Sequence, residues 1–218
     1  PRRTALSADA PSSPQLRLTL PHHKARFGYT GAMTVRLIGA NPGLRLFADD
    51  GEGELLGYAS VWRVDWSPYG TGPAVVTWYD QRPRVISPSA ELGRWLADEF
   101  TRHFPEVRGL PWPEPEVTVA PVTLELDLAH GVRAQAADLE VEITDPLDRR
   151  LIRVDDFDLG GTPHLLSTVL LPCRHGAMRI GGVAVPGAPR LRNLDGGDGP
   201  VASSAFLADA EVWCHPAE

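Results

Sequence analysis

One stretch of the sequence has the pattern of an amphipathic α-helix: residues 87–105, which read SPSAELGRWLADEFTRHFP. Ser87 is a suitable N-cap, and Pro88 follows at the first helical position, where a missing N–H costs no hydrogen bond. Pro105 ends the pattern. We therefore expect one helix over about residues 88–104. The apolar stripe of this helix, at three- and four-residue spacing, consists of Leu92, Trp95, Leu96, Phe100, His103 and Phe104.

Most of the remaining sequence alternates with the two-residue period of β-strands. The longest such segment, residues 55–66, places Arg63 and Asp65 on one face. About ten segments of this kind, separated by turn residues, are typical of sandwiches and barrels. We predict a mainly β fold: an antiparallel β-barrel, or a barrel-like sandwich, of about ten strands with the helix packed over a sheet face or an open end. The opposite face of residues 55–66 carries Leu56, Tyr58, Ser60, Trp62, Val64 and Trp66.

The chain is expected to form one domain after a short disordered segment. Residues 1–14 are small, polar and rich in proline, which predicts disorder. Strand-like alternation begins at Gln15, so residues 15–218 are assigned to one barrel-like domain. The proline-rich residues 109–115 form an extended connector and mark the one candidate boundary inside it. Residues 41–43, Asn-Pro-Gly, predict a turn.

Composition excludes several classes of function. The net charge of −7 is unfavourable for binding nucleic acid, which requires a basic surface. The apolar runs are far shorter than the roughly 18 residues of a membrane-spanning helix. Arg2 and Arg3 are not followed by an apolar region, so a secretory signal is absent or already removed. We expect a cytoplasmic protein with no membrane span and no nucleic-acid partner.

No motif indicates a metal or a cofactor. Cys173 and His175, with Cys214 and His215, lack the spacing of paired zinc ligands. Two cysteines are too few for a disulfide framework, although one bridge between them is conceivable in an exported protein. The acidic run that begins at Asp155 lacks the final glutamate of a calcium loop. We expect no metal site and no cofactor.

The aromatic side chains are the strongest indication of a ligand site. Tyr58, Trp62 and Trp66 fall on one strand face, Trp78 lies on the next strand, and Phe206 lies near the C-terminus. Large rings at successive inward positions are difficult to pack densely, so they could line a cavity for an apolar molecule. The alternative is that the same rings simply fill the core.

In size, strand-rich pattern and residue usage (one lysine among 21 basic residues), the chain resembles lipocalin-type β-barrels that accompany polyketide and enediyne biosynthesis in GC-rich bacteria. The resemblance implies that a fatty-acyl, polyene or polyketide-like molecule is bound in the barrel interior. The function would then be to sequester or present a hydrophobic biosynthetic intermediate.

Two other classes of function stay open. One is a cofactor-independent cyclase, isomerase or hydratase, with Asp65, Tyr58 or Tyr69 as the general acid or base. This class requires an ionisable group that points inward. The other is a homodimeric interaction module without a ligand, which a compact core with no void would favour.

Overall fold

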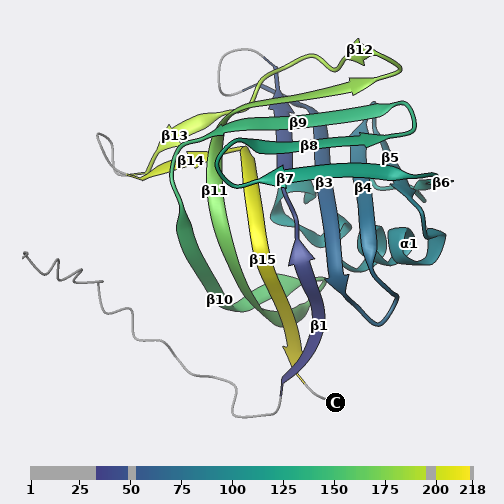
Figure 1. The fold of residues 1–218 in the computed structure, drawn as a ribbon, viewed down its shortest axis with the longest axis vertical. Coiled ribbons are helices and arrows are strands. Elements are labelled where there is room, and N and C mark those ends of the chain that lie inside the picture. The colour runs from purple at the N-terminus through teal and green to yellow at the C-terminus, as the bar shows by residue number, and fades with distance from the viewer. Residues whose placement is uncertain (1–32, 49–52, 195–199, 217–218) are drawn as a thin grey trace, which may run out of the picture. The chain divides into compact units, whose positions relative to one another are not determined.

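The structure is a computed structural model that describes residues 33–48, 53–194 and 200–216 (Figure 1). This part of the chain contains fifteen strands, one α-helix and two 3₁₀ turns. The described residues form one compact unit, and the connector at residues 109–115 lies within it. The predicted disordered segment and the strand expected from Gln15 lie outside the described residues.

The first sheet, called sheet A, is antiparallel except at one edge, where β5 and β6 are parallel. Its central strand β3 is the segment with the strongest strand pattern, and it keeps the predicted length. In spatial order the strands are β6 (Glu116–Val119), β5 (Arg82–Ser87), β4 (Gly72–Tyr79), β3 (Leu55–Trp66), β1 (Met33–Ala40), β15 (Ala205–Pro216), β11 (Thr162–Ile180) and β10 (Arg150–Leu159).

Strand β2 (Gly43–Phe47) continues the path of β1, because both pair with β3 and β15. The predicted turn at residues 41–43 is therefore wrong: Asn41 and Pro42 interrupt one strand without reversing it. Pro42 has no N–H to give to the ladder, but its carbonyl accepts from the backbone N–H of Val61 at 2.9 Å.

The second sheet, sheet B, shares β11 with sheet A. The first part of β11 pairs with β10 and β15, whereas residues from Cys173 onward pair with β9 and β12. The antiparallel, barrel-like sandwich with one helix is confirmed, but the pairing does not close into a barrel. The remaining strands of sheet B are β7 (Val122–Asp127), β8 (Gly131–Ala136), β9 (Leu139–Pro146) and β12 (Val183–Ala184); β13 (Leu191–Asn193) and β14 (Val201–Ser203) pair separately.

Sheet A has a different hydrophobic core on each face. In Figure 1, β7, β8 and β9 run across the front of β1, β3 and β4, while α1 lies behind them. The core between the sheets, called the inter-sheet core, is aliphatic and includes Val61, Val75, Val141, Ile143 and Met178. The core between sheet A and the helix, called the aromatic core, includes Tyr58, Trp62, Trp78, Trp95, Phe100, Phe104 and Trp213.

The helix is shorter than predicted. α1 spans Ala90–Glu99, and two 3₁₀ turns follow it, η1 (Thr101–His103) and η2 (Pro105–Val107). Its N-cap is Ser89, whose Oγ accepts from the N–H of Leu92 at 3.2 Å, and not Ser87, which ends β5. None of the helices in the described residues is long and apolar enough to cross a membrane.

Candidate functional site

The aromatic core is a solid cluster of rings. The centroid of the Trp62 ring lies 5.6 Å from that of Phe100 and 6.0 Å from that of Phe104. Trp213 packs against the other side of both phenylalanines, with centroids 5.5 and 6.0 Å away. The Trp62 side chain has 0% of its surface exposed, so no water-sized space touches it. These rings interlock, and they do not surround a cavity.

The five predicted ligand-binding residues are not brought together. Tyr58, Trp62 and Trp78 are buried in the aromatic core. Trp66 is 45% exposed, because the pairing of β1 with β3 shifts register between Ile38 and Gly39 and ends the regular alternation before this residue. Phe206 is half-buried and packs over Gly43.

The three predicted catalytic candidates are not brought together either. Asp65 is exposed, and its Oδ1 lies 3.2 Å from Arg63 Nε. Tyr69 is exposed, and the centroid of its ring lies 5.0 Å from that of Trp95.

The aromatic core encloses a carboxyl group that the sequence analysis missed. Glu211 is only 4% exposed, and its Oε2 accepts from Trp213 Nε1 at 3.1 Å. Burial raises the pKa of Glu211 to about 8. Burial also raises the pKa of Tyr58, with a smaller contribution from the charge of Glu106. Glu211 is therefore largely protonated at neutral pH and too enclosed to meet a substrate.

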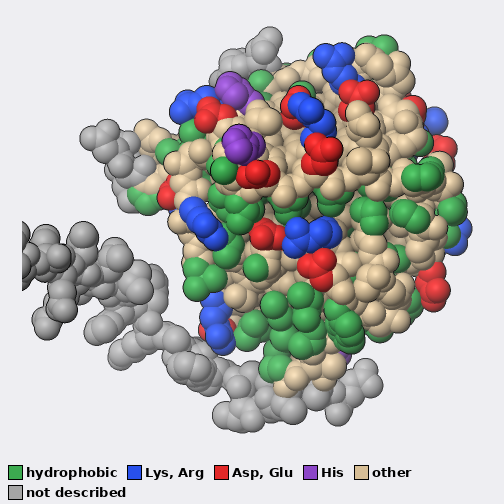
Figure 2. All heavy atoms as spheres, viewed as in Figure 1, with side chains coloured by type: hydrophobic (Ala, Val, Ile, Leu, Met, Phe, Trp, Pro, Cys, Tyr) green, Lys and Arg blue, Asp and Glu red, His purple; other side chains and the backbone are tan. Residues whose placement is uncertain are grey.

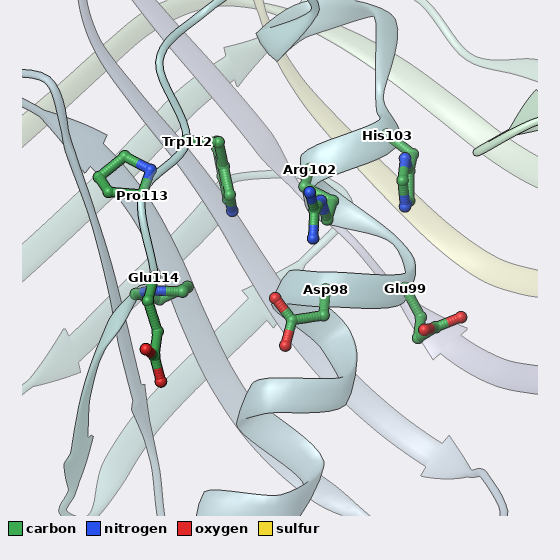
Figure 3. Close-up of a pocket in the computed structure, with 8 residues that line it drawn as sticks. Asp98, Glu99, Arg102, His103, Trp112, Pro113 and Glu114 are labelled. Atoms are coloured by element: carbon green, nitrogen blue, oxygen red, sulfur yellow. The ribbon is translucent and has the colours of Figure 1, made fainter.

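A cavity of about 450 Å³ lies elsewhere, between the end of α1, η1 and the proline-rich connector (Figure 3). We call it the helix–connector groove. Its volume is within the range of roughly 300–1,000 Å³ that is common for small-molecule sites. The groove is lined by Asp98, Glu99, Arg102, His103, Trp112, Pro113, Glu114 and Pro115.

The connector is held against the aromatic core at its first residues. Trp78 Nε1 donates to the carbonyl of Pro111 at 2.9 Å, and the Trp112 side chain packs against the core. Prolines at positions 113 and 115 fix φ and keep the chain extended as it leaves the core. The connector then joins the parallel edge strand β6, so one wall of the groove is anchored at both ends.

One carboxylate of the groove is already neutralised. Glu99 Oε2 accepts from Arg36 Nη2 at 2.6 Å, and Arg36 Nη1 lies 2.9 Å from His164 Nε2. His164 Nδ1 lies 2.9 Å from the carbonyl of Thr162, which only accepts; Nδ1 therefore carries the proton and Nε2 accepts from Arg36. Burial lowers the pKa of His164, so this imidazole is neutral at pH 7.

Other groups in the groove lack such partners. Within the described part of the chain, Asp98, Arg102 and Glu114 form no ion pair and no side-chain hydrogen bond. Trp112 Nε1 is a buried donor with no acceptor in those residues. The only sequence signals for this site were the segment Pro-Trp-Pro-Glu-Pro-Glu at residues 111–116 and the acidic pair at the end of the helix.

The described residues contain no group of three or more side chains suited to a metal ion. Both cysteines are free thiols, and Cys173 is buried. A second cavity, of about 250 Å³, lies on sheet B beside the ion pair of Arg133 and Glu142.

Comparison of this chain with protein families, with curated proteins and with solved structures finds no match.

Proposed function

We propose that this protein binds a small organic molecule in the helix–connector groove. The observation that carries the proposal is a cavity of about 450 Å³ whose connector wall is anchored at both ends and whose lining holds charged side chains with no protein partner within the described residues. Small-molecule sites are commonly concave and carry a few polar side chains that orient the ligand.

This proposal keeps the predicted class, a small-molecule binder, and changes the site. An apolar chain of the fatty-acyl, polyene or polyketide type would need space beside Trp62, and that side chain is in full contact with its neighbours. In the groove the apolar surface comes from Trp112, Pro113 and Pro115, and the rest of the lining consists of acidic, arginine and histidine side chains. A place in secondary-metabolite biosynthesis stays a prediction. A cytoplasmic location fits the two free cysteines.

The test is a fragment screen read by the indole N–H signals in ¹H–¹⁵N spectra. The Trp112 signal is assigned from its loss in the Trp112→Phe variant. A ligand in the groove should shift this signal, whereas the signal of the exposed Trp66, at the far end of β3, serves as the internal control and should stay in place. If no fragment shifts the Trp112 signal, the proposal is wrong.

A long-chain fatty acid and a polyene belong in the same screen. Binding of either that moved the signals of Trp62 and Trp213, and left Trp112 unchanged, would return the site to the aromatic core. A cyclase, isomerase or hydratase would need an acid that reaches its substrate, and the acid with the clearest pKa shift, Glu211, is enclosed.

A homodimer is the second candidate, favoured by an exposed apolar patch. Val35 and Ile38 of β1 and Trp66 of β3 are exposed, and Ile38 is the cross-strand partner of Trp66. Figure 2 shows hydrophobic side chains gathered over the ends of β1, β3 and β15. Sedimentation velocity should then show a dimer that Trp66→Glu dissociates and Tyr79→Glu, at an exposed aromatic residue of β4, leaves intact. A monomer at every concentration would exclude this candidate.

A further inference from the structure

Two arginines lie against one aromatic ring at the end of β2. The guanidinium carbon of Arg190 is 3.6 Å from the centroid of the Phe47 ring, and that of Arg45 is 5.8 Å from it. We call Arg45 and Arg190 the arginine pair. A guanidinium group is planar and directs its N–H groups sideways, so a contact with the face of a ring leaves them free to donate. The Phe47 ring therefore holds two positive charges close together.

The backbone holds the arginine pair in place. Ser204 is only 4% exposed, and its Oγ accepts from the N–H of Arg190 at 2.8 Å. The same hydroxyl donates to the carbonyl of Arg45 at 3.0 Å. Phe47 and Ala188 exchange two backbone hydrogen bonds of 3.0 Å, which bring the chain just before Arg190 alongside β2. One buried serine thus joins the two arginines, and their positions require no ligand.

The arginine pair differs from the other arginines of similar burial. Six arginines in the described residues are half-buried. The four that pair with a carboxylate are Arg36, Arg63, Arg84 and Arg150. Arg45 and Arg190 form no ion pair within the described part of the chain, and Arg190 Nη2 donates only to the neutral carbonyl of Gly53. Acidic residues are not scarce, because the net charge of the chain is −7.

Each guanidinium group of the pair is enclosed on one side. Arg45 Nε and Arg190 Nε are buried and have no acceptor, and they lie too deep to meet a ligand. Both Nη atoms of Arg45 and Nη1 of Arg190 have no partner in the described residues and are not enclosed in this way. A cation that has lost part of its hydration without gaining a counter-charge is unfavourable. An anion that reaches the Nη atoms therefore relieves a cost that a fully exposed arginine does not have.

We propose that the arginine pair binds a phosphate group with two negative charges, either free or as a monoester. Near neutral pH such a group carries close to two charges and has three strong acceptor oxygens. One group can therefore neutralise both guanidinium ions and accept from each of them. A carboxylate or a phosphodiester carries a single charge and would leave one arginine without a counter-charge. This site shares no residue with the helix–connector groove and does not depend on the function proposed for the groove.

The test compares methyl phosphate with dimethyl phosphate, which keeps the tetrahedral phosphorus and has one charge instead of two. Acetate is the probe for a carboxylate. Affinities are measured by calorimetric titration at pH 8 and a fixed low ionic strength. Methyl phosphate should bind about tenfold or more tightly than either other probe, because each of them loses a charge-assisted contact. Inorganic phosphate separates the two sources of this chemistry: binding equal to that of methyl phosphate assigns the free ion, and weaker binding assigns the monoester.

Three variants assign the binding to the arginine pair. Arg45→Gln and Arg190→Gln should each weaken methyl phosphate about tenfold or more and remove its advantage over dimethyl phosphate. Arg94→Gln, at an exposed position of α1, loses the same charge elsewhere and should change no affinity. Methyl phosphate should raise the thermal unfolding temperature of the wild-type protein and not that of Arg45→Gln. Without an anion, Arg45→Gln should unfold at the wild-type temperature or above it, because it removes one of two like charges.

The alternative occupant is a carboxylate of the same chain. Asp49, Asp50 and Glu52 follow β2 in the sequence and lie outside the described residues. If methyl phosphate binds to the triple variant Asp49→Asn, Asp50→Asn, Glu52→Gln and not to the wild-type protein, these carboxylates occupy the arginine pair and the proposal is overturned. It is also overturned if no probe binds to either protein, if the three organic probes bind equally, or if Arg94→Gln weakens binding as much as Arg45→Gln does.

Discussion

The two faces of sheet A differ in chemistry. The inter-sheet core is built from Val, Ala, Leu, Ile and Met, and the one ionisable group that belongs to it in the described residues is the thiol of Cys173, whose pKa burial raises to about 12. The aromatic core contains or adjoins the buried Tyr58, His164 and Glu211. One face thus holds two sheets together, and the other carries the buried tyrosine, histidine and glutamate of the described residues.

The composition of the aromatic core explains this difference. Indole N–H groups can donate inside an apolar region, so they allow acceptors to be buried. Trp62 Nε1 donates to Thr101 Oγ1 at 3.3 Å, and Trp213 Nε1 donates to Glu211. Aliphatic side chains have no such group, and a carboxyl between the two sheets would be left without a donor. The aromatic face is therefore where a site can be built, and the helix–connector groove adjoins it.

The largest predicted effect compares adjacent residues of β3 that face different cores. Trp62→Ala should destabilise the protein by about 3–5 kcal/mol, because it removes the ring at the centre of the aromatic core and leaves a cavity. Val61→Ala, equally buried in the inter-sheet core, should cost only about 2 kcal/mol. Urea denaturation measures both. Equal losses of stability in the two variants would mean that the ring of Trp62 contributes no more to the stability of the fold than the side chain of Val61 does.

The same Trp62→Ala variant indicates whether a hollow core can bind a ligand. The new cavity is lined by Phe100 and Phe104 and should be dry and apolar. Added indole should raise the thermal unfolding temperature of this variant and leave that of the wild-type protein unchanged. A stabilised wild-type protein would show that space for a ring already exists beside Trp62.

The second prediction concerns the buried carboxyl of Glu211. Its pKa is about 8 in the folded protein, against about 4.5 for an exposed glutamate, so the folded state holds a proton that the unfolded state releases. The contribution of Glu211 to the free energy of unfolding is therefore greatest below pH 4.5 and declines as the pH rises towards 8. The decline is on the order of 5 kcal/mol, because the pKa rises from 4.5 to about 8 on folding and each pKa unit corresponds to about 1.4 kcal/mol.

Glu211→Gln should remove this decline. The variant keeps an acceptor for Trp213 Nε1 and cannot ionise, so it should match the wild-type protein near pH 5 and exceed it near pH 8. Urea denaturation across pH 5–9 measures the difference. Glu125→Gln, on the exposed side of β7, is the control. Parallel pH profiles for the wild-type protein and Glu211→Gln would show that Glu211 is ionised in the folded state.

The contrast between the faces also shows what the sequence predicts and where it stops. Alternation along residues 55–66 correctly put Tyr58 and Trp62 on one apolar face, because this period depends on the strand alone. Trp66 was misassigned because the register shift arises from the pairing of β3 with β1, which no local pattern contains. The Asn41–Pro42 break has the composition of a turn, and only its two strand neighbours show that the chain continues straight.

The candidate site was harder to foresee than the fold. Glu211 and Trp213 share a face of β15, so the alternation could have placed this carboxyl inside, but a glutamate in a strand ordinarily points to solvent. The helix–connector groove forms between segments that are separate in sequence, and its lining depends on how the connector packs against α1. Neither spacing nor composition determines such a contact.

The third prediction concerns the contact of α1 with sheet A. A Cβ on Gly93 would lie 2.8 Å from Val85 Cγ1 and 3.1 Å from Ser87 Cβ. Gly93→Ala would gain up to about 1 kcal/mol of helix propensity. The overpacking cost of about 1–3 kcal/mol should exceed that gain and destabilise the protein. Glu91→Ala, exposed on the same helix, should leave stability nearly unchanged. A stabilised Gly93→Ala would show that the helix can move away from the sheet.

The smallest predicted change in stability distinguishes an indole N–H that has a hydrogen-bond acceptor from one that has none. Trp78→Phe removes the donor to the carbonyl of Pro111 and should cost about 1–3 kcal/mol, because that acceptor loses its hydrogen bond in a partly buried place. Trp112→Phe removes a buried donor that has no acceptor within the described residues, so stability should stay the same or rise by about 1 kcal/mol. The two variants are compared by urea denaturation without ligand. A loss at Trp112 as large as that at Trp78 would mean that the Trp112 N–H already has an acceptor.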